Sequence, residues 1–395
     1  MESNTEVVIK EAKEEEVKII NLNSLYSYLE RVRDGRKAQG LRYKLATILV
    51  LIILAKLCGQ DTPSGIADWA QLRTEYLLDV LKVKGKRMPH HSTYRRILQD
   101  EIDEEELEQI FNEYWVQQPS SGQDVVIAID GKTVRGTITA DDPFGLHLLA
   151  AYLPGEGIVL MQMVVEKDKE NEIVVAPKLL KCLDLRGKVV VGDAMQTQRN
   201  LSIQIVEAGG DYVWIAKDNQ PKTRQAIEQL FAPQKSAPGL GCPPMDFHSE
   251  EIFNKEHGRL EQRSITVSSL LNDYLDWPNV AQVFKLERRF TYVATGRVHH
   301  EVQYGLTSLT PQEASPKRLL NIVRSEWAIE NGLHYRRDVT FREDATRMTR
   351  KSMGRAMAAI NNLVIGLINQ QDFDNHAHAR RVFDANPANA LALIF

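Results

Sequence analysis

The stretch Asp124-Val-Val-Ile-Ala-Ile129-Asp130-Gly131 decides the fold class. Its β-branched apolar run is typical of a buried strand, and the run ends in an acidic residue and a glycine. Lys188-Val-Val-Val-Gly-Asp193 repeats this pattern. Apolar runs at 146–153 and 158–165 lie between the two, followed by a helical pattern. A further helix and strand end the series at residue 216, and the order β-β-β-α-β-α-β predicts an α/β fold with a mixed sheet flanked by helices.

The chain before this sheet is predicted to be helical. Residues 1–21 form a charged, flexible lead-in, and residues 22–118 form an N-terminal all-helical domain closed by the linker Pro119-Ser-Ser-Gly122. Ser92 or Thr93 is the expected cap of a helix with a basic face. Small helices ending in a basic one are typical of DNA-reading modules, and an all-helical packing domain is the alternative.

The chain after residue 220 interrupts the strand-helix alternation. Residues 119–220 are predicted to hold the first part of the sheet domain, and residues 221–305 a β-rich insertion containing a Pro- and Gly-rich stretch. The helical period returns over 306–372, and residues 373–395 are expected to be a loosely ordered tail with an apolar end.

Composition and charge narrow the class of protein. Of 395 residues, 43% are hydrophobic and 26% are charged, which is typical of a globular protein rather than a disordered one. The longest apolar run, 45–55, is shorter than the roughly 20 residues that a membrane-spanning helix needs. The three cysteines have no paired spacing, the first residues carry no signal-peptide pattern, and a reducing cytoplasm is expected.

Local charge differs from the net charge of −4. Residues 40–100 hold ten Lys and Arg against five Asp and Glu, and residues 317–355 hold the same numbers. Two basic segments on a weakly acidic chain favour DNA-facing surfaces, although charge runs are often only solvated faces.

Three carboxylates form the candidate catalytic and metal site. Asp130 and Asp193 sit at or just past the ends of predicted central strands, where functional groups gather in open sheets. Glu330 lies within a predicted helix, on the face of Trp327 and His334 that would pack on the sheet. Three converging carboxylates repel one another without cations, whereas Mg²⁺ accepts carboxylate ligands together with water and phosphate. Two such ions support phosphodiester transfer.

Each carboxylate also has an ordinary structural interpretation. Asp130 fits a turn, Asp193 fits a helix cap, and Glu330 fits a surface residue paired with Arg337. Glu326 is a rival third ligand, but it is expected to lie further from the apolar stripe of the helix.

Several strings resemble the motifs of ISAs-type, or H-repeat-associated, insertion-sequence transposases. They are Ile129-Asp-Gly-Lys-Thr-Val-Arg-Gly136, Val191-Gly-Asp-Ala-Met-Gln-Thr-Gln198, Tyr212-Val-Trp-Ile-Ala-Lys-Asp-Asn-Gln-Pro221, His257-Gly-Arg-Leu-Glu-Gln-Arg263, Trp327-Ala-Ile-Glu-Asn-Gly-Leu-His-Tyr335 and Asp338-Val-Thr-Phe-Arg-Glu-Asp344. Arg33-Asp-Gly-Arg-Lys-Ala-Gln-Gly-Leu-Arg-Tyr43 is similar to their associated helical domain. The resemblance spans residues 22–370.

The resemblance implies an RNase H-like DDE domain with a β-rich insertion between the second Asp and the Glu. It assigns the triad to Asp130, Asp193 and Glu330, with Mg²⁺, or alternatively Mn²⁺, as cofactor. The implied partners are the terminal inverted repeats of an element and target DNA, bound by a protein dimer in the bacterial cytoplasm at the nucleoid, with no membrane. Related transposases often carry Tyr, Arg and Lys around the Glu, where this chain has Val323, Glu326 and Arg337.

Ten polar residues are candidates for DNA contacts, because phosphate groups are bound mostly by basic and amide side chains. They are Lys132, Arg135, Lys217, Asn219, His257, Arg259, Arg263, Arg337, Arg95 and Arg96. The implied activity is metal-dependent DNA cleavage and strand transfer of an insertion sequence. The alternatives are an inactive DNA-binding relic, a stand-alone nuclease, and a helical scaffold.

Overall fold

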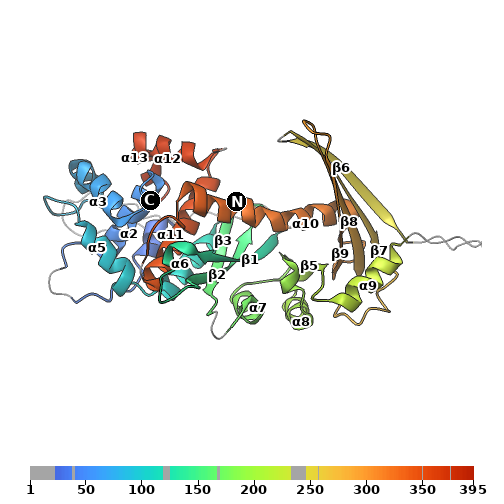
Figure 1. Ribbon diagram of the computed structural model, residues 1–395. Coiled ribbons are helices and arrows are strands. Elements are labelled where there is room, and N and C mark those ends of the chain that lie inside the picture. The colour runs from blue at the N-terminus through green and yellow to red at the C-terminus, as the bar shows by residue number, and fades with distance from the viewer. Residues whose placement is uncertain are drawn as a thin grey trace, which may run out of the picture.

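A nine-stranded mixed sheet runs along the molecule in the order β3-β2-β1-β4-β5-β9-β8-β7-β6 (Figure 1). The computed structural model describes residues 23–37, 41–118, 125–166, 170–232, 246–256, 258–348, 350–373 and 375–395. The expected lead-in 1–21, the linker 119–122, the Pro- and Gly-rich stretch 233–244 and His257 lie outside these residues. The strands are β1 Val126–Val134, β2 Leu146–Leu153, β3 Ile158–Val164, β4 Val189–Gly192, β5 Asp211–Ala216, β6 His248–Glu256, β7 Arg259–Ser268, β8 Gln282–Tyr292 and β9 Val298–Thr307.

The first five strands confirm the predicted mixed sheet. β1, β2 and β3 pair antiparallel, while β4 pairs parallel with both β1 and β5. The apolar runs are buried, as expected for central strands covered on both faces. Helices α7 Glu172–Lys181 and α8 Arg199–Glu207 lie on one side of the sheet, and α10 Pro316–Ile329 lies on the other (Figure 1).

The strands of the expected insertion extend this same sheet. β9 pairs antiparallel with β5, and β8, β7 and β6 follow as a meander. Helix α9 Pro221–Leu230 packs against β8 and β9. The sequence predicted β7, β8 and β9 but not β6, whose mostly polar residues carry no apolar alternation.

Helices form the N-terminal end of the molecule. They are α1 Leu25–Leu29, α2 Leu45–Leu57, α3 Pro63–Leu72, α4 Thr74–Val80, α5 His91–Arg96 and α6 Glu104–Gln117. All of α2 except Thr47 is buried, which confirms the buried helix predicted there. Among the described residues, no helix is both long and apolar enough to cross a bilayer.

Two local predictions are wrong. The cap of α5 is His90, whose side chain accepts from the amide of Ser92, so neither Ser92 nor Thr93 is the cap. The tail is ordered: after α11 Lys351–Asn369, helices α12 His376–Ala385 and α13 Pro387–Leu391 pack on α2. Apolar residues of α12 face α2, and buried Arg380 is anchored by an ion pair with Asp61 (2.6 Å).

Candidate metal centre

Strand register brings Asp130 and Asp193 together. The parallel pairing of β1 with β4 ends at Ile129 and Gly192, so the two aspartates are the next residues on neighbouring strands. The expected strand end at Asp130 is wrong, because β1 continues to Val134 through its antiparallel pairing with β2. Asp130 therefore lies inside strand β1, one residue beyond the point where the neighbouring strand β4 ends. The side chain of Asp130 is accessible there because β4 does not continue on that side.

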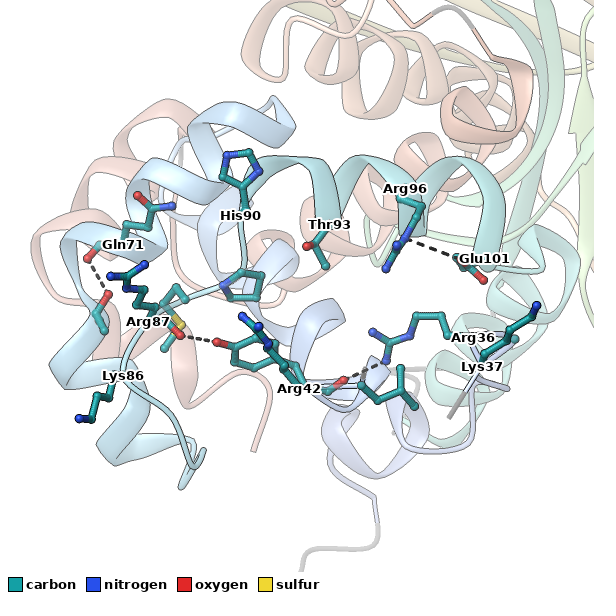
Figure 2. Close-up of a pocket in the computed structure, with 16 residues that line it drawn as sticks. Arg36, Lys37, Arg42, Gln71, Lys86, Arg87, His90, Thr93, Arg96 and Glu101 are labelled. Carbon is teal, nitrogen blue, oxygen red and sulfur yellow. Dashed lines mark hydrogen bonds and ion pairs between the residues drawn. The ribbon is translucent and has the colours of Figure 1, made fainter. Parts of the chain in front are cut away.

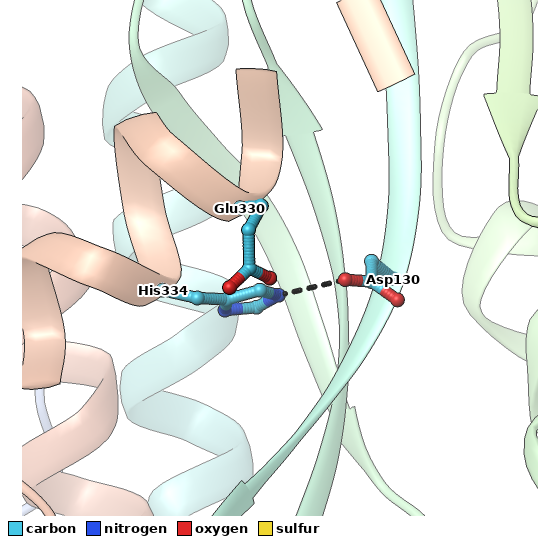
Figure 3. A group of neighbouring side chains, drawn as sticks. All are labelled: Asp130, Glu330 and His334. Atoms are coloured by element: carbon cyan, nitrogen blue, oxygen red, sulfur yellow. Dashed lines mark hydrogen bonds and ion pairs between the residues drawn. The ribbon is translucent and has the colours of Figure 1, made fainter. Parts of the chain in front are cut away.

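Helix α10 brings Glu330 close to Asp130, at the point where the helical pitch changes. Helix α10 ends at Ile329 and continues as π-helical turns, Glu330–His334 and then Arg336–Thr340. π-helical turns are rare, occur often at functional sites, and shift the phase of all later side chains. Glu330, the first residue after α10, and the buried His334 both point toward Asp130 from one side (Figure 3). One ligand atom from each of the three lies within 4.8 Å of the others, and His334 Nε2 is 3.1 Å from Asp130 Oδ2.

The environment of Asp193 favours a neighbouring cation. Its carboxylate caps the short 3₁₀ helix Ala194–Gln196 by accepting from the amides of Met195 and Gln196. Burial, followed by the negative charges of Glu172 and Asp130, nevertheless raises the pKa of Asp193. A positive ion would remove this repulsion, so the oxygen-rich donor set fits a hard divalent cation.

Glu326 is closer to the aspartates than expected. It is half-buried, and burial raises its pKa to about 7; Lys217 opposes this shift, while Asp193 and Asp130 add to it. Trp327, expected to pack on the sheet, is 54% exposed, and Glu330 is also exposed. The predicted inward face of α10 is therefore wrong at these positions, because Glu326 occupies the side facing the sheet.

Glu326 should make stability depend on pH. A carboxyl group with a raised folded pKa contributes its full stability below its ordinary pKa of 4.5 and loses that contribution as pH rises through about 7. We therefore expect urea unfolding midpoints in a metal chelator to fall over this pH range, and to fall less in Glu326→Gln. Asp193 shifts in the same direction, so part of the slope should remain. An unchanged slope in Glu326→Gln would contradict this account.

One carboxylate that the sequence did not reveal lies beside the aspartates. Glu172, at the start of α7, is paired with His147 Nε2 at 2.7 Å and accepts from Gln196 Nε2 at 3.3 Å. Its carboxylate lies directly over the backbone of Gly131, because a Cβ at Gly131 would be 2.1 Å from Glu172 Oε1. A larger residue at position 131 would displace this carboxylate from its place beside Asp130. No local pattern could have linked Glu172 to the site, since the tertiary fold alone brings it there.

Two predicted DNA contacts are held in internal ion pairs. Lys132 is buried, and its Nζ is 2.5 Å from Asp338 Oδ1. Arg337 is fully buried against Glu343, with Nη2 to Oε2 at 2.7 Å. Arg337 is therefore not the partner of Glu330 that the alternative interpretation required.

The other predicted DNA contacts spread over three regions. Lys217 is exposed near the carboxylates, Asn219 donates to the carbonyl of Ala194, and Arg135 is exposed beyond the end of β1, where its Nε lies 3.8 Å from Asp344 Oδ2. Arg259 lies over the rings of Phe290 and Tyr292 on the β extension. Arg263 pairs with Glu261 and lines a pocket of about 240 Å³ beside α10, whose other basic members are Arg288 and Arg324. Arg95 and Arg96 are exposed on α5, in the helical end of the molecule.

Comparisons with known proteins agree with the transposase motifs found in the sequence. Residues 26–115 match the family model described as DDE_Tnp_1-associated, and residues 121–367 match the Transposase DDE domain. The candidate transposase YncI of Escherichia coli O157:H7 is 30% identical over 359 residues, which cover 88% of each chain. The H repeat-associated candidate transposase YhhI of Escherichia coli K12 is 28% identical, over 88% of this chain and 91% of its own.

Among solved structures, a piggyBac transposase synaptic complex with hairpin DNA aligns with a TM-score of 0.40 and 11% identity, over 94% of this chain and 76% of that one. The domain match at residues 121–367 spans more than half of the chain and includes Asp130, Asp193 and Glu330. This chain belongs to the DDE transposase family and to its H-repeat-associated type.

Proposed function

We propose that this chain cleaves DNA strands at the ends of an insertion sequence and joins them to target DNA, using an RNase H-like domain. The observation that carries the proposal is the convergence of Asp130 and Glu330 within 4.8 Å, with Asp193 on the adjoining strand. Asp130 lies in β1, Asp193 follows β4 directly, and Glu330 follows α10 directly. This chain order of Asp, Asp and Glu is the order expected of a DDE site.

Asp130, Asp193 and Glu330 are the proposed ligands of Mg²⁺, with Mn²⁺ as an alternative. Bound divalent ions supply Lewis acidity for phosphodiester transfer and stabilise the charge on the attacking and leaving oxygens. His334 holds the Asp130 carboxylate through its Nε2 contact, so it is a positioning residue for the first aspartate. Glu172 adds a further negative charge next to Asp193, so a bound cation becomes more favourable there.

Exposed basic and amide residues around the carboxylates are proposed to hold DNA. Lys217 lies close enough to contact phosphates next to the reacting strand, with Asn219 two residues further on. Arg135 would contact DNA further away, beyond the end of β1. Arg259, Arg263 and His257 would contact flanking DNA from the β extension, and Arg95 and Arg96 from the helical end. Lys132 and Arg337 would have to exchange their internal ion pairs for phosphate, so they contribute chiefly to structure.

The proposed partners are the terminal inverted repeats of the element and a target duplex. Two element ends must be brought together for transposition, so a dimer on DNA is proposed. The bacterial nucleoid is the corresponding location. Phosphate contacts of this kind make affinity fall steeply with salt.

A cleavage and joining assay tests the proposal. Duplexes carrying the element ends should be nicked only when Mg²⁺ or Mn²⁺ is present, and EDTA should stop the reaction. A pre-cut end with a free 3′-OH should then join to a target duplex. Asp130→Asn and Asp193→Asn should bind the same DNA without cutting it, because the substitutions keep side-chain size and remove charge.

The alternatives predict different products in this assay. Salt-sensitive binding with no cleavage by the wild-type chain identifies an inactive relic. Hydrolysis without joining of the pre-cut end identifies a stand-alone nuclease. Cleavage that survives both aspartate substitutions would place the chemistry elsewhere in the chain.

A further inference from the structure

A large basic pocket lies among the N-terminal helices (Figure 2). In Figure 1 helices α2, α3 and α5 lie at one end of the molecule, apart from strands β1 and β5. The pocket has a volume of about 1090 Å³. It is lined by Gly35, Arg36, Lys37, Leu41, Arg42, Tyr43, Gln71, Thr74, Lys86, Arg87, Met88, Pro89, His90, Thr93, Arg96 and Glu101. Six of these residues are Lys or Arg, whereas Glu101 is the one carboxylate among them, so the pocket is strongly positive.

Much of this positive charge is not neutralised within the fold. Arg36 is paired with Asp34 at 2.6 Å, and Arg96 lies 3.8 Å from Glu101. Within the described part of the chain, no ion pair is found for the exposed Arg42, Lys86 or Arg87. Like charges that share one concave surface repel one another and attract anions.

Hydrogen bonds hold the two walls of the pocket together. The hydroxyl of Tyr43 donates to the carbonyl of Arg87, which joins the 41–43 segment to the 86–90 segment. Arg36 Nη2 donates to the carbonyl of Tyr43 at 2.9 Å. The dashed lines in Figure 2 mark these contacts, and the basic side chains extend from both walls. These two hydrogen bonds therefore link the backbone segments that carry Arg36, Arg42 and Arg87.

We propose that this pocket binds the phosphate backbone of duplex DNA; the choice of DNA rests on the proposed function. Pockets for small organic ligands are mostly apolar with a few polar groups, whereas this pocket is large and its lining is dominated by cationic and polar residues. Arg42, Lys86 and Arg87 carry the contact, and Arg36 supports the wall beneath them. The contact carries affinity rather than sequence information, since it involves phosphate.

Metal-free binding tests the pocket separately from catalysis. Fluorescence anisotropy in EDTA would measure binding of the full chain to a duplex of arbitrary sequence at several salt concentrations. Arg42→Ala/Arg87→Ala should weaken binding on the order of tenfold, and the slope of log affinity against log salt should fall by about 0.9 for each lost phosphate contact. Both side chains are exposed, so the thermal unfolding midpoint should not move.

Lys82→Ala/Lys84→Ala is the matched control, because it removes two exposed charges from the same region outside the pocket lining. The control should bind as the wild type does. Equal loss in both variants, or no loss in the pocket variant, overturns the proposal. Tighter binding of RNA, or saturable binding of inorganic phosphate that excludes the duplex, also overturns it. If the pocket variant loses DNA binding while the wild type never cleaves DNA, the proposed function fails and this site stands.

Discussion

Glu330→Gln is expected to reduce metal-dependent DNA cleavage on the order of 10² to 10³-fold, since a bound metal is worth several kcal/mol to the transition state. The Glu330 carboxylate lies with Asp130 and His334 in a group of ligand atoms within 4.8 Å, and it is exposed to incoming DNA. Glutamine keeps its length but removes the charge that a hard cation needs. Initial rates of strand nicking at saturating Mg²⁺ measure the effect.

Glu326→Gln is the matched control for this assignment. Glu326 lies one helical turn earlier and is close enough to Asp130 and Asp193 for their charges to raise its pKa. Because its carboxyl is partly desolvated and pairs electrostatically with Lys217, we expect Glu326→Gln to retain most of the cleavage rate. The reverse result, with cleavage lost in Glu326→Gln and kept in Glu330→Gln, would transfer the third ligand position to Glu326.

The two aspartates show what sequence patterns could predict. Runs of Val and Ile before Asp130 and Asp193 identify central strands, and parallel strands place their ends at one edge of the sheet. The prediction needed only these local apolar runs and the rule for where functional groups gather in open sheets. It failed to find that β1 passes through Asp130, because antiparallel pairing with β2 is a tertiary contact.

Glu330 shows where this reasoning stops. The sequence prediction placed Trp327 inward and Glu326 further out, whereas the structure has Trp327 exposed and Glu326 facing the sheet. This error lies within the regular part of α10, whose buried residues Leu319, Ile322 and Ile329 form a stripe that includes Glu326. The change of helical pitch begins only at Glu330 and alters the phase of the side chains that follow it. Glu172 reaches the site through the packing of α7, which leaves no local signal, whereas the helical pattern already predicts that His334 faces the sheet.

Glu343→Ala is expected to destabilise the fold by about 3–5 kcal/mol, because it leaves the buried charge of Arg337 without its partner. The exposed fractions of these side chains are 0% for Arg337 and 1% for Glu343, and Nε and Nη2 of the arginine both contact Glu343 Oε2. Asn361 donates to the other carboxylate oxygen at 2.8 Å. Urea unfolding followed by circular dichroism measures the change. Asp184→Ala, which breaks an exposed pair with Arg186, is the control and should leave the midpoint unchanged.

The double variant Arg337→Met/Glu343→Leu separates buried charge from lost packing. Removing both charges together replaces an ion pair with apolar side chains of similar size, which is often neutral or stabilising. We therefore expect it to recover most of the stability lost in Glu343→Ala. The backbone amide of Glu343 also donates to the backbone carbonyl of Arg337 at 3.0 Å. The two residues therefore close, through side chains and backbone together, the turn that follows Glu330 and His334. If the double variant is stable but cleaves slowly, the ion pair fixes the position of Glu330; if it cleaves normally, packing alone is sufficient for that role.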